Sequence, residues 1–299
     1  MKRQDGFTML KLLDLSGKID PSTVELYEAV DRVAAAMDVP FFLIGATARD
    51  TVMEQVFSIR SGRATKDVDI ALRVSGWDEV NQLKQALLGT GNFAESREAQ
   101  RLIYRNERPV DIVPFGGISD PDHKISWPPD HDFIMSTAGF EEAYQSAQLV
   151  RMRASPPLNI RVASPAGLAI LKIIAWAERP SERNKDAYDL GFIMGNYLDA
   201  GNYERLMDQH YDLVTVEDFD YTRAGCRLLG RDIGSTANPE TRAKIQDTLQ
   251  AETAETRTYR LARQMAKGFA PHGEEEKRIE QMLALLEELI TGINEIPPK

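Results

Sequence analysis

The sequence lacks several features that would point to common classes of protein. Of its 299 residues only Cys226 is a cysteine, which excludes an intrachain disulfide and a zinc site built from thiolates. No apolar stretch is long enough to span a bilayer, and the first fifteen residues contain no signal-peptide core or cleavage pattern. These absences predict a soluble cytoplasmic protein without a membrane partner.

The chain also lacks an excess of positive charge. It has 36 lysines and arginines against 46 aspartates and glutamates, giving a net charge of −10 and a pI near 5.1. A general electrostatic attraction to nucleic acid or to an anionic membrane is therefore not expected. A nucleotide or an RNA would have to be bound through local positive charge or through metal ions.

What is present is an ordinary globular composition, with 42% hydrophobic and 27% charged residues. Apolar periodicity and turn residues predict helices and strands in the order α-β-α-β-α-β-β up to residue 115, followed by a long loop over 116–133. Beyond Pro156-Pro157 the pattern is almost entirely helical. We therefore expect an α/β (α+β) fold in which a small mixed sheet flanked by helices occupies residues 1–155 and a helical domain occupies 156–299.

Two carboxylates stand out in the predicted strand 63–73. Asp67 and Asp69 alternate with apolar residues, so both project from the same side of the strand, where their charges repel. A divalent cation would remove that repulsion, and Asp111 in the hairpin 101–115 offers a third carboxylate if the two strands are neighbours. The simpler alternative is that these are solvated charges on the open face of a sheet.

A glycine turn upstream favours the metal interpretation. In "LIGATARD" an apolar strand ends at Gly45 and a helix follows, so that the backbone can approach a ligand and present free N–H groups to phosphate. Thr47 adds a hydroxyl at the same turn. Taken alone the turn is weak evidence, since a glycine and a threonine cap occur at many strand-to-helix turns.

In combination, these segments resemble the nucleotidyltransferase superfamily related to DNA polymerase beta. That superfamily has a Gly-Gly or Gly-Ser turn, a strand with Asp-h-Asp (h is apolar) and a third Asp. Here "GATARD", "RATKDVDIAL" and "LAILKIIAWAERPSERNKDAYDL" resemble most closely the AbiEii/MenT group of nucleotidyltransferase-like toxins. The resemblance covers about residues 41–190; Ala46 departs from it, because the group has a second glycine or a serine there.

The resemblance implies a role for each matching residue. Metal ligands would be Asp67, Asp69 and Asp111, and the later functional lysine and aspartate would be Lys172 and Asp186. The residues expected to contact the nucleoside triphosphate lie at the turn and before the Asp-x-Asp strand: Gly45, Ala46, Thr47, Arg49, Arg63, Thr65 and Lys66. Without the resemblance, Lys172 would be interpreted as a lysine that extends to solvent. For Asp189 the sequence leaves open both a functional role and a charge on the wet face of its helix.

The reaction implied is transfer of a nucleoside monophosphate from an NTP to an acceptor hydroxyl, with Mg²⁺ or Mn²⁺ and release of pyrophosphate. The expected partners are an NTP, an acceptor that could be RNA, and an antitoxin protein. The sequence leaves an RNA end, a protein hydroxyl and a small molecule open as acceptors. Two other classes also remain: an inactive nucleotide-binding or regulatory protein of the same fold, against which the three aspartates argue, and a purely structural α/β protein.

Overall fold

The computed structural model describes residues 12–62, 65–254, 258–267 and 275–296. Among them an eight-stranded mixed sheet has the spatial order β1-β9-β10-β2-β3-β6-β5-β4, and a two-stranded sheet pairs β7 with β8. The strands are β1 Leu13–Asp14, β2 Phe41–Leu43, β3 Val68–Arg73, β4 Phe93–Glu95, β5 Arg101–Tyr104, β6 Arg108–Phe115, β7 Lys124–Ser126, β8 Ile134–Ser136, β9 Gln148–Arg153 and β10 Leu158–Val162.

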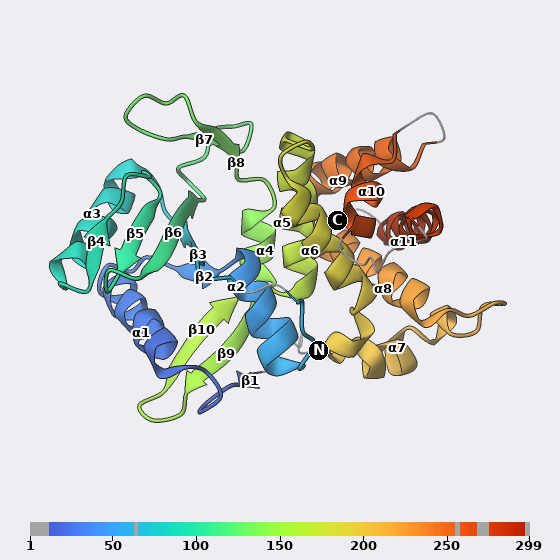
Figure 1. The fold of residues 1–299 in the computed structure, drawn as a ribbon, viewed down its shortest axis with the longest axis horizontal. Helices are drawn as coiled ribbons and strands as arrows, with labels where there is room; N and C mark the ends of the chain where they lie inside the picture. The colour runs from blue at the N-terminus through green and yellow to red at the C-terminus, as the bar shows by residue number, and fades with distance from the viewer. Residues whose placement is uncertain (1–11, 63–64, 255–257, 268–274, 297–299) are drawn as a thin grey trace, which may run out of the picture.

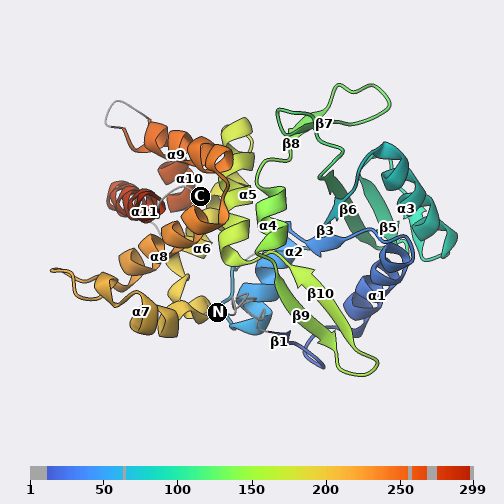
Figure 2. The same ribbon diagram turned by 180° about the vertical axis from the view of Figure 1, so that it is seen from behind.

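Helices lie on both sides of this sheet and make up the C-terminal half (Figures 1 and 2). Those that accompany the sheet are α1 Pro21–Ala36, α2 Gly45–Arg49 with the π-helical η1 Asp50–Val56, α3 Trp77–Gly89 and α4 Phe140–Gln145. The others are α5 Pro165–Glu178, α6 Asn184–Gly195, η2 Leu198–Asn202, α7 Tyr203–Gln209, η3 Tyr211–Leu213, α8 Tyr221–Thr236, α9 Pro239–Thr253, α10 Arg260–Lys267 and α11 Glu275–Glu295. The expected fold class is confirmed.

Short polar signals start several of these helices. Asp20 caps α1 by accepting from the backbone N–H of Thr23, and Pro21 occupies the first turn. Ser164 caps α5 in the same way, again with a proline directly after it. Proline is tolerated there because the first turn has no intrahelical partner for its missing N–H. Both starts follow from the local sequence alone.

The sheet extends past the boundary that composition suggested. Ser155 lies in the turn between β9 and β10, and β10 pairs in parallel with β2, so both strands belong to the same sheet as β3. The change to helices comes at Pro165, where α5 begins. The expected long loop 116–133 also contains β7, which pairs with β8 to form a small hairpin. Compositional change marks these transitions only approximately, because strand pairing depends on distant segments.

The C-terminal helices pack on α5 and α6 at the end of the molecule away from α1 and α3 (Figure 1). Contact between α8 and α11 is very close, since a Cβ at Gly230 would lie 2.9 Å from the Cα of Gly292. Cys226 is fully buried in α8, as expected of a small apolar side chain. None of the described helices is long and apolar enough to cross a membrane.

Candidate active site

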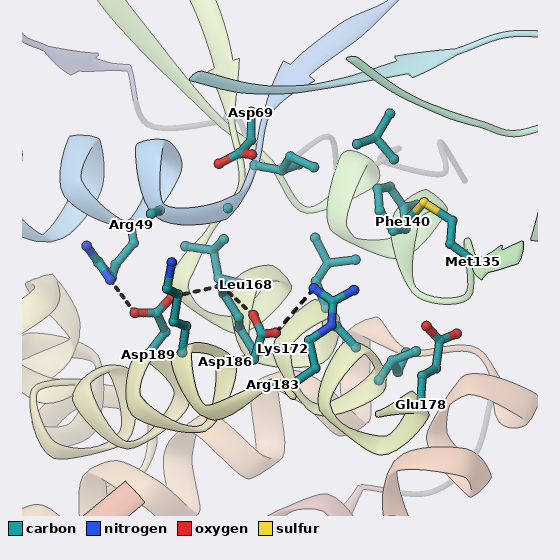
Figure 3. A pocket seen from close by; sticks show the side chains of 18 of the residues that line it. Arg49, Asp69, Met135, Phe140, Leu168, Lys172, Glu178, Arg183, Asp186 and Asp189 are labelled. Atoms are coloured by element: carbon teal, nitrogen blue, oxygen red, sulfur yellow. Dashed lines mark hydrogen bonds and ion pairs between the residues drawn. The ribbon is translucent and has the colours of Figure 1, made fainter. Parts of the chain in front are cut away.

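A cavity of about 630 Å³ lies between the sheet and the pair α5/α6. Figure 3 shows Asp69 on one side of it and charged side chains of α5 and α6 on the other, with Phe140 and Met135 along a third side. Its wall combines a charged half and an apolar half. The polar and charged residues are Thr65, Lys66, Asp67, Asp69, Arg49, Ser136, Lys172, Glu178, Glu182, Arg183, Lys185, Asp186 and Asp189, and the apolar ones include Val113, Met135, Phe140, Leu168 and Ile174.

The turn at Gly45 brings the start of α2 against the carboxylate of Asp69. Gly45 has φ +62°, and a Cβ there would lie 2.8 Å from Cγ of Asp69, closer than side chains approach one another. The backbone N–H of Ala46 donates a hydrogen bond to the same carboxylate. Only glycine allows both the positive φ and this approach. The sequence signal at Gly45 thus has a specific structural cause.

Burial, together with the neighbouring carboxylates of Asp111 and Asp67, raises the pKa of Asp69 to about 7, although Lys172 opposes the shift. The ionised form is therefore disfavoured, since it is poorly solvated and faces other negative charges. A cation bound beside Asp69 would stabilise the ionised form of its carboxylate.

The three predicted metal ligands lie on two neighbouring strands and on the segment that leads into one of them. β3 and β6 are parallel neighbours with Asp69 directly opposite Asp111, and Asp67 precedes β3 at a more exposed position. However, Asp111 does not line the cavity. The guanidinium of Arg101 lies on it instead, with Nε 2.7 Å from Oδ1 and Nη2 2.9 Å from Oδ2. Thus Asp67 and Asp69 face the cavity, while Asp111 faces an arginine.

Thr47 does not occupy the position expected of a phosphate ligand. Its side chain is buried and its hydroxyl donates a 2.8 Å hydrogen bond to the backbone carbonyl of Asp67. It is not part of the cavity wall. The hydroxyl fixes α2 on the chain entering β3, so Thr47 positions the Asp-x-Asp segment rather than presenting a free donor to a ligand.

Arg49 is also held by protein groups. Its side chain is 1% exposed, its Nη2 lies 2.6 Å from Oδ1 of Asp50, and its Nη1 is ion-paired with Asp189. A guanidinium so placed joins the start of the α2–η1 helix to α6, which is 140 residues away in the chain. Its positive charge borders the cavity, but its donors are directed at these two carboxylates.

Lys172 lies between two carboxylates of α6, with Nζ 2.8 Å from Asp186 and 2.7 Å from Asp189 (Figure 3). Its side chain is 11% exposed, so it lines the cavity and does not extend to solvent. Burial lowers the pKa of Lys172, but the two aspartates outweigh this and the pKa is raised. The amine is therefore charged. Arg183, 3.6 Å from Asp186, extends the chain of ion pairs.

The remaining predicted ligands lie before β3. Thr65 and Lys66 are exposed at the cavity wall, and the hydroxyl of Thr65 donates to the carbonyl of Asp67 at 3.5 Å. Arg63 lies outside the described residues. Lys66 is the predicted ligand whose charge borders the cavity from an exposed position.

The donor set fits a divalent cation at Asp67 and Asp69, because two carboxylates border one cavity and the ionised form of Asp69 is poorly compensated. The described residues contain no group of three or more His, Cys, Asp or Glu side chains placed to hold one metal ion. The fit is therefore to a pair of carboxylates.

The sequence patterns assign no role to Arg101 and leave Asp189 open between a functional position and the wet face of its helix. Asp189 is 2% exposed and holds both Arg49 and Lys172. Arg101 had a usable signal: the turn after Tyr104 sets a hairpin register that places residue 101 opposite Asp111. Asp189 belongs to the segment 185–190 that carries part of the resemblance, but its contacts with Arg49 and Lys172 join α6 to two other helices, which the local sequence does not indicate.

Comparison with protein families adds a match across residues 28–285 to the model described as "Nucleotidyl transferase AbiEii toxin, Type IV TA system". The chain belongs to this family. The match extends well beyond the residues 41–190 on which the resemblance was based, and includes most of the C-terminal helices. AbiEii proteins are nucleotidyltransferases of toxin–antitoxin systems, which confirms the resemblance. No curated protein matches the chain.

Some solved structures resemble the chain at low identity and with low TM-scores. The solution structure of the antibiotic-resistance factor ANT(2'')-Ia is 14% identical, covers 66% of this chain and 96% of its own, and has a TM-score of 0.36. A CCA-adding enzyme in complex with ATP is 11% identical, with 89% and 66% covered and a TM-score of 0.32. The Thermotoga maritima CCA-adding enzyme complexed with tRNA is 9% identical, with 94% and 83% covered and a TM-score of 0.31.

Proposed function

We propose that the protein transfers a nucleoside monophosphate from an NTP to an acceptor hydroxyl, in a reaction that requires Mg²⁺ or Mn²⁺. The observation that carries this is the placement of Asp67 and Asp69 on one wall of a cavity whose opposite wall bears Lys172. Family membership supports the reaction class, and the acidic pair supports the cation.

In this proposal the cavity binds the NTP with its phosphates near Gly45 and Ala46. A divalent ion on Asp67 and Asp69 would neutralise phosphate charge and polarise the α-phosphate. Lys66 and Lys172 add positive charge from two sides of the cavity, while Arg49 acts through Asp189 by holding α6 in place. The apolar wall formed by residues such as Phe140 suits a base or sugar better than phosphate.

The acceptor hydroxyl gives its proton to water as its oxygen attacks the α-phosphorus, the bond from that phosphorus to the bridging oxygen breaks, and pyrophosphate leaves with both electrons of that bond. Catalysis then consists mostly of alignment and charge stabilisation. The charged network around Lys172 supplies this alignment, because its amine is held between Asp186 and Asp189 and cannot swing freely. The protein itself forms no covalent intermediate.

We propose that the acceptor is RNA, which is the first class of acceptor to test for a protein of a toxin family. We also propose that a separate antitoxin protein binds this chain. Each α-labelled NTP is incubated with Mg²⁺ and with RNA, protein or small-molecule acceptors, and the products are identified by mass spectrometry. Transfer to one acceptor is expected, and Asp67→Asn and Asp69→Asn should each abolish it. Mg²⁺-dependent NTP binding without transfer to any acceptor would favour the inactive regulatory protein.

A further inference from the structure

Arg101 lies within the group of carboxylates that the Asp-x-Asp pattern assigns to metal ions. It projects from β5 and pairs with Asp111 across the antiparallel ladder to β6. Two parallel N–H···O contacts, at 2.7 and 2.9 Å, engage both oxygens of Asp111. The same guanidinium reaches toward Asp67, whose Oδ2 lies 3.6 Å from Nη2.

This pairing is held in place by the backbone as well as by charge. Strand register fixes Arg101 opposite Asp111, so little side-chain freedom is lost when the bond forms. A planar guanidinium that meets a carboxylate through two donors is among the strongest ion-pair geometries. The side chains are 24% and 17% exposed, so that water screens the pair only in part. A cation arriving at Asp111 would have to displace this partner.

A second divalent cation at Asp111 would also lie directly beside the guanidinium of Arg101, where the like charges repel each other. The cation position also lies at Asp67 and Asp69, which border the cavity, and not at Asp111, which does not.

On the basis of the proposed function, we infer that the site binds one divalent cation, at Asp67 and Asp69, and that the guanidinium of Arg101 takes the place of a second cation at Asp111. Asp111 is then a positioning residue that holds Arg101, and not a metal ligand. In a two-ion site the second positive charge comes from a cation bound from solution, whereas here the side chain of Arg101 supplies it.

Counting bound ions tests this inference without reference to activity. Mn²⁺ is titrated into the metal-free protein at pH 8, and the free ion is followed by electron paramagnetic resonance. We expect one Mn²⁺ per chain in the wild type and loss of that ion in Asp69→Asn. Arg101→Gln removes the guanidinium and frees Asp111, so two ions per chain are expected. Arg101→Lys keeps the charge and should still bind one.

The outcomes separate the inference from the function on which it rests. Two ions in the wild type would overturn the inference and leave the proposed reaction standing. One ion in both the wild type and Arg101→Gln, with circular dichroism showing that the variant is folded, would also overturn the role of Arg101. No bound ion in any of these proteins would overturn the cation requirement of the proposed function. The wild-type count decides between one and two ions even if Arg101→Gln does not fold.

Discussion

At the level of single residues, the carboxylate of Asp69 lies where a side chain at residue 45 would be. A Cβ on residue 45 would overlap the Asp69 carboxylate, and φ of +62° is unfavourable for any other residue. The turn and the carboxylate therefore form one feature, although 24 residues separate them in the chain. A substitution at residue 45 should therefore displace the carboxylate of Asp69.

Gly45→Ala is expected to lower the free energy of unfolding by more than the about 1–2 kcal/mol that conformational strain alone would cost, because Asp69 must also move. Mn²⁺ affinity should fall at the same time. Gly17→Ala is the matched control, since Gly17 has φ +77° with open space around it. Urea unfolding and Mn²⁺ titration of both variants measure the difference; equal losses of stability, with Mn²⁺ affinity unchanged, would show that the close approach to Asp69 is unimportant.

The raised pKa of Asp69 predicts a pH dependence for the metal-free protein. Its pKa of about 7 in the folded state exceeds the ordinary value of 3.8, so the folded state binds the proton more tightly. The stability that this group contributes is therefore greatest at low pH and is lost as pH rises toward about 7. Asp69→Asn should raise the melting temperature at pH 8 by a few degrees and change it less at pH 5. Asp208→Asn, at an exposed position, is the control.

That comparison must be made without divalent ions, because a bound cation would stabilise the ionised carboxylate. An Asp69→Asn variant that melts at the same temperature as the wild type at both pH values would contradict the assigned electrostatics. Asp67 is a different case despite its place two residues away, since it is more exposed and has Arg101 as a neighbour.

At the level of elements, ion pairs connect the helix after the glycine turn to α6 and then to α5. Arg49 reaches Asp189 from α2, and Lys172 reaches the same carboxylate from α5. Both interactions are nearly excluded from solvent, where removing one partner leaves an uncompensated charge. The wall of the cavity is therefore held in shape by charges.

Lys172→Met should lower the free energy of unfolding by about 1–3 kcal/mol, the scale of an unpaired buried polar group, because Asp186 and Asp189 lose the amine between them. It should also weaken binding of Mg²⁺-NTP. Adding Asp186→Asn should restore part of the stability without restoring nucleotide affinity. Chemical unfolding and calorimetric titration measure the two effects, with Lys18→Met, which is exposed and is not part of the cavity wall, as the control.

An unchanged nucleotide affinity in Lys172→Met would assign the lysine to structure alone. A loss of affinity that the second substitution fully reverses would mean that the lysine affects nucleotide binding only by compensating the negative charge of the two aspartates. The expected pattern, recovery of stability without recovery of binding, distinguishes a direct contact with phosphate from both.

On the scale of the whole molecule, the cavity lies between the sheet and the helical half, so a ligand there contacts both. The chain as a whole is acidic, with a net charge of −10, and an anionic substrate is attracted only where basic side chains and a cation offset this. The family match also spans both halves, from residue 28 to 285. Ligand binding should therefore stabilise the molecule as one unit.

A non-hydrolysable NTP analogue with Mg²⁺, at about 100 times its dissociation constant, should stabilise the protein by about 2.7 kcal/mol and raise its melting temperature by several degrees. A single unfolding transition is expected to shift. The double variant Asp67→Asn/Asp69→Asn should show no Mg²⁺-dependent shift with the same analogue. Differential scanning calorimetry checks both; a shift of equal size in the double variant would place the nucleotide elsewhere.

The sequence by itself determined those features that depend on neighbours in the chain. Alternation placed Asp67 and Asp69 on one face, the caps at Asp20 and Ser164 started helices, and the turn at Gly45 indicated a close approach of the backbone to a ligand. Local steric and hydrogen-bonding preferences suffice for such features.

Only the tertiary structure decided which charges face which. The hydroxyl of Thr47 binds a carbonyl, Asp189 is buried between Arg49 and Lys172, and Asp111 holds Arg101 instead of lining the cavity. Each of these contacts joins segments far apart in sequence or on adjacent strands, and depends on how helices pack across the sheet. A polar side chain can have similar neighbours in the sequence whether it is solvated, ion-paired or bound to a ligand. Burial and the nearest opposite charge decide among them, and both are set by packing.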